Sequence, residues 1–213
     1  MKKRYYGIIP AIAAVTLIAG GYATWIFSAS TTTSTSLGVT IEKKSVGATG
    51  AWTVDGINNN YSESTYKLIL DQPKWELNPD GAGAYFQKNL NIYFTPTDVS
   101  SFDTSKYTFT ITFTLNSTLT TYVNFSYNGS NVTSGTSIDI TNSVKSSWNA
   151  ESNAKCVFYS SNDSGSLVLT PSYVTNTEYG LGNDKSTASN AATTLRNLTN
   201  AITITAAITA IEE

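Results

Sequence analysis

The clearest pattern along the chain is a strict alternation of apolar and hydroxyl side chains between Lys106 and Asn116. One face of this segment carries large apolar residues and the other carries only threonine: Tyr107, Phe109, Ile111, Phe113 and Leu115 alternate with Thr108, Thr110, Thr112 and Thr114. A two-residue repeat places every second side chain on the same face of a β-strand. Because β-favouring residues occupy both faces, the pattern predicts a strand of an antiparallel sheet with one buried face.

Shorter segments of β-favouring residues follow one another along the rest of the chain. The predicted strands cover residues 37–41, 66–70, 84–95, 122–127, 137–140, 154–159, 166–170 and 201–211. Turn-forming clusters such as Asn78-Pro79-Asp80-Gly81 and Asn128-Gly129 separate them. Many short strands bounded by turn signals are typical of an all-β fold. We therefore expect a single antiparallel β-sandwich, jelly-roll-like, with roughly eight to ten strands over residues 37–213.

One segment departs from this rhythm, because helical spacing replaces alternation between Ser186 and Leu198. Small and apolar residues recur there at the spacing of a helix face: Ala188, Ala191, Ala192, Leu195 and Leu198. Either Asp184 or Ser186 supplies a side chain that caps the start of such a helix. The sequence predicts one short helix that leads into the last strand.

The N-terminal segment has the three-part order of a secretory signal. A basic start at residues 2–4 precedes an almost wholly apolar run over residues 8–19, and small residues follow. Gly21 and Ala23 occupy the small positions that a signal peptidase recognises. We therefore expect cleavage after Ala23, with residues 1–23 as the signal peptide.

The competing interpretation of this segment is an uncleaved membrane anchor. Residues 8–27 are mostly apolar and just long enough to cross a bilayer as a helix, with the basic side inside. In either case the chain touches a membrane only through this segment. Residues 24–36 then form a Ser/Thr-rich stretch that is too polar to order itself, so we expect a flexible segment before the sandwich at 37–213. The same stretch also fits a strand that becomes ordered only when it pairs with a partner.

The run Ala19-Gly20-Gly21-Tyr22-Ala23-Thr24-Trp25-Ile26-Phe27-Ser28 resembles the end of a SipW-type signal peptide. Such signals are found on the TasA and camelysin family of Gram-positive matrix proteins. The resemblance covers only the N-terminal segment, and Phe27 is followed by Ser28-Ala29-Ser30 where the family usually has Asn or Ser and then Asp. It implies a secreted β-sandwich that polymerises into biofilm fibres, with the N-terminal strand of one subunit completing the sheet of the next.

Composition excludes several classes of function. The chain has no histidine and one cysteine, Cys156, which excludes histidine-dependent nucleophilic sites, histidine-ligated metals and an intramolecular disulfide. The scarcity of cysteine in an exported chain favours a bacterial origin. Without the signal peptide, 10 basic and 15 acidic residues remain, a net charge of about −5. No basic cluster is left for nucleic acid or anionic lipid.

Asn-x-Ser/Thr triplets, the acceptor motif for N-linked glycans in exported proteins, recur along the chain. There are seven of them, at Asn60, Asn116, Asn124, Asn128, Asn131, Asn162 and Asn197. A chain so rich in Asn, Ser and Thr produces such triplets by chance, so the sequence alone assigns them no role.

Four features of the sequence are candidate sites. Cys156 alternates with apolar neighbours, which favours a core thiol over a nucleophile. Three tryptophans, Trp52, Trp75 and Trp148, are candidates for a stacking platform that binds sugars, but core packing is the commoner fate of tryptophan in a sandwich. Loops at 78–83, 162–165 and 182–184 contain oxygen ligands for calcium but lack the spacing of a calcium loop, which favours plain turns. The acidic residues form no suggestive pair, so we expect no enzyme, no metal and no cofactor.

Two functions follow from these expectations. The first is a secreted or cell-surface structural protein, a fibre or matrix subunit that associates with further copies or with other surface proteins. Its assembly would use donation of the N-terminal strand, with Leu37, Val39 and Ile41 as the inserted side chains. The same triplet equally fits pairing within its own domain. The second function is a surface adhesin or carbohydrate-binding module that binds a polysaccharide through exposed Trp and Tyr.

Overall fold

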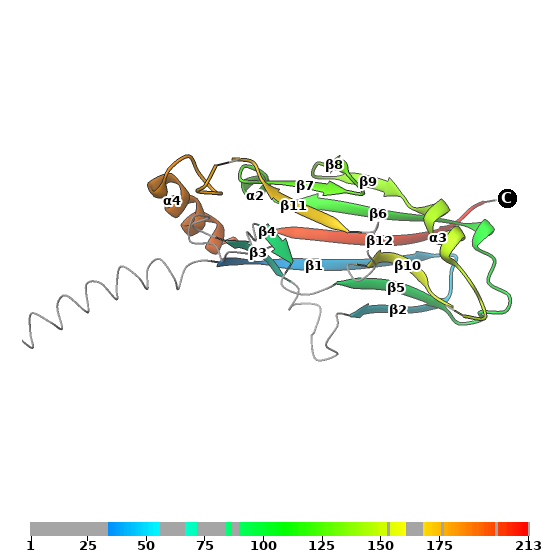
Figure 1. Ribbon diagram of the computed structural model, residues 1–213. Coiled ribbons are helices and arrows are strands. Elements are labelled where there is room, and N and C mark those ends of the chain that lie inside the picture. The colour runs from blue at the N-terminus through cyan, green and yellow to red at the C-terminus, as the bar shows by residue number, and fades with distance from the viewer. Residues whose placement is uncertain are drawn as a thin grey trace, which may run out of the picture.

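The computed structural model describes residues 34–55, 67–71, 84–86, 90–152, 154–160, 168–175, 177–198 and 200–212. These residues form an elongated body whose longest strands run along its length (Figure 1). The helix α4 (Lys185–Arg196) lies at one end, and the helix α3 (Thr141–Ser147) lies with the C-terminus at the other.

The larger layer is a six-stranded sheet with the order β4-β3-β1-β12-β6-β9. Its strands are β1 (Ser34–Val46), β3 (Lys67–Asp71), β4 (Ala84–Phe86), β6 (Tyr107–Leu115), β9 (Thr136–Asp139) and β12 (Ile202–Ala210). β12 pairs antiparallel with β6 along its whole length. Because β1 is the other neighbour of β12, the first and last strands lie side by side in the middle of this sheet.

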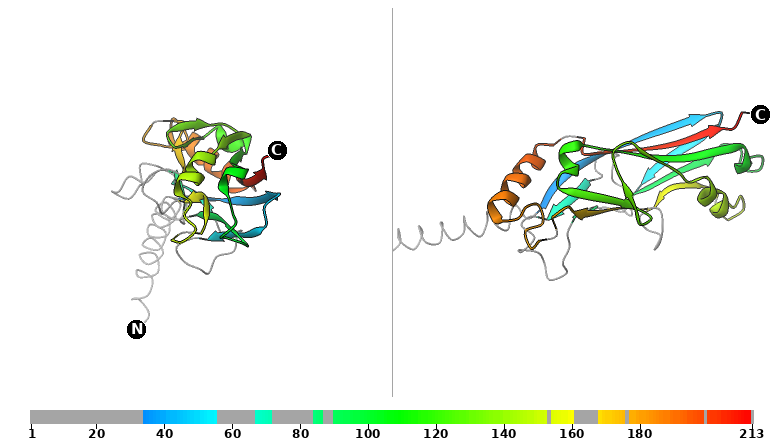
Figure 2. Two further views of the ribbon diagram at one scale, coloured as in Figure 1. Left: turned by 90° about the vertical axis from the view of Figure 1, so that its right-hand side faces the viewer. Right: turned by 90° about the horizontal axis from the view of Figure 1, so that it is seen from above.

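Two three-stranded sheets, ordered β10-β5-β2 and β11-β7-β8, form the opposite layer. Their strands are β2 (Gly50–Asp55), β5 (Asn91–Pro96), β10 (Cys156–Ser160), β7 (Val123–Tyr127), β8 (Ser130–Val132) and β11 (Leu169–Tyr173). Phe158 in β10 packs with its ring centroid 5.9 Å from that of Phe109, whereas Tyr127 in β7 packs 5.3 Å from Phe113 further along β6. The two small sheets therefore cover different parts of the large one, as the two views of Figure 2 show.

Alternation along β6 and β12 produces the core between the layers. In β6, Phe109, Ile111 and Phe113 are fully buried while the threonines between them face outward. In β12, Ile204 and Ile208 are fully buried in the same way. Each such side chain contributes about 1.5–3 kcal/mol of transfer free energy. The prediction that this alternation marks a strand with one buried face is confirmed.

The predicted helix before the last strand is also confirmed. Asp184 rather than Ser186 caps α4, and its Oδ1 accepts the backbone N–H of Thr187 at 2.8 Å. The small and apolar residues of one helix face are buried: Ala188, Ala191, Ala192 and Leu195. This face docks the helix on the end of the sandwich, where α4 contacts β1.

The prediction of a purely antiparallel sandwich is wrong at the centre of the large sheet. β1 and β12 run parallel, with Val39 opposite Ile202 and Val46 opposite Thr209. Antiparallel pairing is the rule for strands joined by a short hairpin. No hairpin joins the first and last strands, so packing rather than a turn sets their relative direction.

Several predicted boundaries also differ from the structure. β1 begins at Ser34, inside the stretch predicted to be flexible, because those residues pair with β3. The single strand predicted over residues 84–95 is two strands, since β4 belongs to the large sheet and β5 to a small one. The described residues form twelve strands instead of the predicted eight to ten. They also form further short helices besides α3, namely α2 (Ser117–Thr120) and the 3₁₀ turn η3 (Thr104–Lys106).

The predictions for the N-terminal export segment lie outside the described residues. These are the signal peptide 1–23 with Gly21 and Ala23 at its cleavage site, the alternative anchor to about residue 27, and the greater part of the segment 24–36. In the part of the chain that the structure does describe, none of the helices has the length and apolar character needed to cross a membrane.

Candidate functional site

The predicted donor strand lies in the middle of the large sheet of its own chain. The first part of β1 pairs antiparallel with β3, from Ser34 opposite Asp71 to Gly38 opposite Lys67. The second part pairs in parallel with β12, beginning at Val39. β1 is therefore the strand that connects β3 and β4 to the rest of the sheet.

The inner face of β1 supplies apolar side chains to the core. Val39 is 3% exposed and Ile41 is 6% exposed, and Ile41 lies opposite the fully buried Ile204. The backbone of Leu37 pairs with that of Leu68, while its side chain lies outside the described residues. Of the three predicted side chains, two are thus seen to be buried, and they are buried within their own chain.

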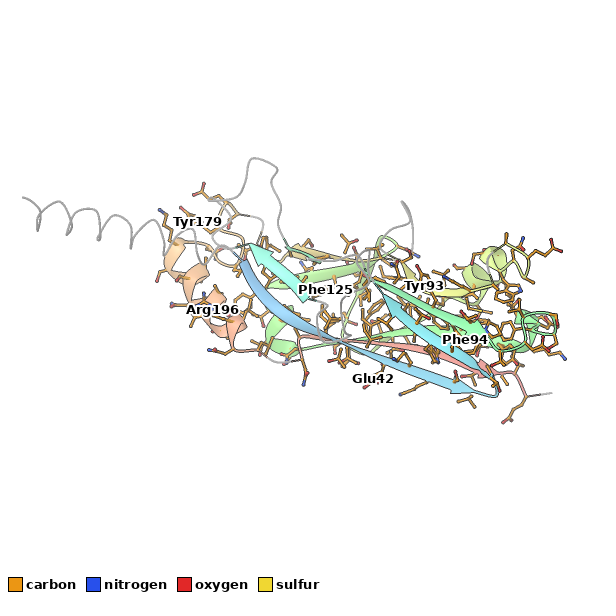
Figure 3. The ribbon with its side chains drawn as sticks, turned by 90° about the horizontal axis from the view of Figure 1, so that it is seen from below. Glu42, Tyr93, Phe94, Phe125, Tyr179 and Arg196 are labelled. Carbon is orange, nitrogen blue, oxygen red and sulfur yellow. The ribbon has the colours of Figure 1, made fainter. Side chains whose placement is uncertain are left out.

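The strand becomes polar after Ile41. Glu42, Lys43 and Lys44 are exposed, and Figure 3 shows Glu42 on the long curved strand β1 in the view from below. Glu42 Oε2 accepts a hydrogen bond of 3.0 Å from the Oγ1 hydroxyl of Thr205 on β12. β1 therefore changes from a buried apolar strand before Glu42 to an exposed, charged one after it.

A short connection joins β1 to the rest of the domain. Residues 47–49 lead directly into β2, which belongs to the opposite layer. Gly47 has a φ of +74°, and a Cβ at this position would lie 2.5 Å from Cβ of Ala210. The connection therefore requires glycine for both its backbone conformation and its close approach to the end of β12.

Two of the three candidate tryptophans meet in one aromatic cluster near the α3 end. Trp52 packs edge-on against Phe94 with ring centroids 5.2 Å apart, and its Nε1 donates to Ser45 Oγ of β1 at 3.0 Å. Trp148 packs 5.2 Å from Phe102, which itself lies 6.3 Å from Phe94. Both indole rings are half-buried, and Trp75 lies outside the described residues.

Cys156 is a fully buried free thiol in β10. Burial raises its pKa from 9.0 to about 12, because a thiolate is poorly solvated in an apolar core. A thiol that stays protonated is a weak nucleophile.

Of the three loops considered as calcium sites, only residues 182–184 lie in the described part of the chain. Residues 182–184 lead into α4, where the carboxylate of Asp184 caps the helix, while residues 78–83 and 162–165 lie outside the described part. Hydrogen bonds from Thr187 hold the pKa of Asp184 below its ordinary value. Within the described residues, no group of three or more Cys, Asp or Glu side chains gathers at a distance suited to a metal ion.

Sequence reasoning missed a buried polar seam between the small sheets. The hydroxyl of Tyr159 in β10 accepts the backbone N–H of Leu169 in β11 at 2.9 Å. Beside it, Ser160 Oγ donates to Asn91 Oδ1 at 2.9 Å. The first contact joins β10 to β11, which belong to different sheets, whereas the second joins β10 to β5 within one sheet. Only the tertiary structure reveals these two contacts.

No protein-family model matches this sequence, and neither a curated protein nor a solved structure matches it. The class of protein therefore rests on the fold itself, which is mostly β with sandwich-like layers. Its most distinctive element is the N-terminal strand β1 in the centre of the large sheet.

Proposed function

We propose that this chain is an exported structural protein of the cell surface or extracellular matrix, and that its copies assemble into fibres by exchanging β1. In the fibre, β1 of each copy leaves its own sheet and pairs with β3 and β12 of the next copy. The observation that carries the proposal is the position of β1, a terminal strand with a buried apolar face between β3 and β12.

Exchange of β1 would re-form the native contacts between copies. The parallel pairing with β12 and the antiparallel pairing with β3 would involve the same residues between two copies as they do within one chain. Among the described residues, the connection at 47–49 is the part that would have to change conformation. Short hinge loops favour domain swapping over closure within one chain.

Such exchange produces an open chain of copies. The donated strand and the place that receives it are different surfaces of the same molecule, so the contact is head-to-tail and does not close on itself. Main-chain hydrogen bonds would supply affinity, and the pockets of Val39 and Ile41 would supply register. Export is supported by the signal-like N-terminal segment and by the resemblance of that segment to SipW-type signals.

A peptide competition experiment tests the proposal. The mature protein is followed by light scattering and electron microscopy with and without an excess of a peptide of residues 34–46. We expect filaments without the peptide and shorter or no filaments with it, because the peptide occupies the place of β1 at growing ends. The matched control is the same peptide with Ile41→Asp, which should not inhibit. A protein that remains a monomer across concentration, salt and pH would overturn the proposal.

The adhesin or carbohydrate-binding alternative rests on the aromatic cluster. Trp52 and Trp148 are only half-buried, so part of each ring faces solvent. Their rings pack edge-on or tilted against phenylalanines instead of forming a flat row, which favours the structural protein. Quenching or a shift of tryptophan fluorescence on titration with wall or plant polysaccharides would favour the alternative instead.

A further inference from the structure

Three of the Asn-x-Ser/Thr triplets fall within one hairpin of the structure. β7 and β8 are joined by the two-residue turn Asn128-Gly129, in which both residues have positive φ, 50° and 75°. Asn124 lies in β7, Asn128 in the turn and Asn131 in β8, and all three are exposed. The seven triplets are spread over the whole chain, so three in a single hairpin is a local concentration.

The carboxamides of the hairpin asparagines are available, unlike those of the other described triplets. Within the described part of the chain, the side chains of Asn124, Asn128 and Asn131 make no hydrogen bond. Asn116, by contrast, is half-buried and its Oδ1 accepts the backbone N–H of Thr118 at 2.9 Å. Asn197 is engaged through Nδ2, which donates to the carbonyl of Thr193 at 3.3 Å.

The hydroxyl residue of each triplet is also accessible. Residues two apart in a strand lie on the same face, so Asn124 and Ser126 both face outward from β7. Ser130 and Thr133, which complete the other two triplets, are exposed. The outward face of the neighbouring β11 strand carries the polar residues Thr170 and Ser172, and Val174, two residues further on, is exposed beyond them.

We propose that Asn124, Asn128 and Asn131 are acceptors for N-linked oligosaccharide, which covers the outer face of the β7–β8 hairpin. In the reaction, the carboxamide nitrogen forms a bond to the anomeric carbon of a lipid-linked glycosyl phosphate or diphosphate. The bond from that carbon to the phosphate oxygen breaks with its electron pair, and one amide proton is lost to a base of the transferase. The +2 hydroxyl is the element that the transferase recognises.

The glycans would have a consequence for assembly. β8 is an edge strand of the β11-β7-β8 sheet, and a free edge pairs with strands of other molecules. A sugar on Asn131 covers this edge. β1 and β12 of the large sheet contain no Asn-x-Ser/Thr triplet, so the strands involved in exchange stay free of sugar. The modification thus directs association to the exchange of β1 and away from uncontrolled edge pairing.

This inference rests on the export that the proposed function includes, because transfer to asparagine takes place outside the cytosol. The test uses the full protein isolated from the organism that carries its gene. Trypsin cleaves after Lys106 and Lys145 and leaves one peptide between them that holds Asn116 and the three hairpin asparagines. Fragmentation of that peptide in the mass spectrometer should place sugar on Asn124, Asn128 and Asn131 and leave Asn116 bare.

A matched pair of variants tests the motif itself. Thr133→Ala should remove the glycan from Asn131 alone, whereas Thr133→Ser, which keeps the hydroxyl, should retain it. Unmodified hairpin asparagines, or sugar on Asn116 in their place, would overturn the inference. Unmodified protein that still forms filaments would leave the proposed function intact, and glycosylated protein that forms none would overturn only the fibre.

Discussion

Ile41 of β1 lies directly opposite Ile204 of β12, and the two belong to strands that run parallel although they come from opposite ends of the domain. Ile41 is 6% exposed and Ile204 is fully buried. The two side chains lie on the inner face of the large sheet, where the first strand meets the last. The contact between Ile41 and Ile204 stabilises the folded single chain, and the same contact would form between two chains if β1 were exchanged.

Truncation of Ile41 should destabilise the domain much more than truncation of its neighbour. Ile41→Ala removes buried methyl groups, so we expect a loss of about 2–5 kcal/mol in the free energy of unfolding. Thr40→Ala, on the exposed face of the same strand, should stay within about 0.5 kcal/mol of the parent. Urea denaturation measures both. Equal effects would contradict the packing of β1 described above.

The local pattern of the sequence predicts most strands but not how they are arranged. β6 is evident because nine residues alternate strictly, and each position carries its own signal. β2 was missed although Trp52 and Val54 alternate with smaller residues, because glycine opens the strand and the stretch is short. The parallel pairing of β1 with β12 leaves no local trace, since it joins segments at opposite ends of the chain.

The candidate site was predicted only in part for the same reason. The apolar alternation of Leu37, Val39 and Ile41 marks a strand, but it does not specify which sheet that strand joins. The meeting of Trp52 and Trp148 in one cluster depends on the tertiary fold, as does the contact between Tyr159 and Leu169. The periodicity of apolar residues shows which face of a strand is buried, but only the tertiary structure shows which element packs against that face.

Two buried tyrosines should respond in opposite ways to loss of the hydroxyl. Tyr159→Phe leaves the backbone N–H of Leu169 buried without its acceptor, so we expect a loss of about 1–3 kcal/mol in stability. The Tyr127 hydroxyl is buried without a hydrogen-bond partner in the described structure. Tyr127→Phe should therefore be neutral or stabilising. The matched pair is compared by denaturant titration, and a larger loss for Tyr127→Phe would refute this account of the seam.

The cap of α4 should depend on the side-chain oxygen of Asp184. Asp184→Ala removes the acceptor for the Thr187 N–H and should lower the denaturation midpoint, whereas Asp184→Asn keeps an acceptor and should do so less. Hydrogen bonds from Thr187 lower the pKa of Asp184 below 3.8. Its contribution is therefore present above that value and lost as pH falls through the folded-state pKa. An Ala variant with the acid sensitivity of the parent would argue against this cap.

The thiol of Cys156 should be inert in the folded protein. Its pKa is raised from 9.0 to about 12 by burial, so the unfolded chain releases this proton at lower pH than the folded one. Stability from this group is complete below pH 9.0 and is lost as pH rises toward 12. We expect no alkylation by iodoacetamide at neutral pH without denaturant, and complete alkylation with it. Rapid labelling of the native protein would contradict the buried position.

Exchange of β1 can be tested most directly by tying the strand to its own chain. Thr40 and Thr203 face outward at paired positions of β1 and β12, so Thr40→Cys with Thr203→Cys places two thiols across the ladder without disturbing the core. Neighbouring strands lie about 4.7–4.9 Å apart, which suits a disulfide. Cys156 is buried and should not interfere. Each single-cysteine variant serves as the control.

The order of oxidation and assembly decides the result. Oxidation of the monomer before assembly should hold β1 in its own chain and prevent filaments, and reduction should restore them. Oxidation after assembly should join neighbouring copies, so that a denaturing gel shows a ladder of covalent multimers. Filaments that grow equally well from the oxidised, internally tied monomer would contradict the exchange of β1.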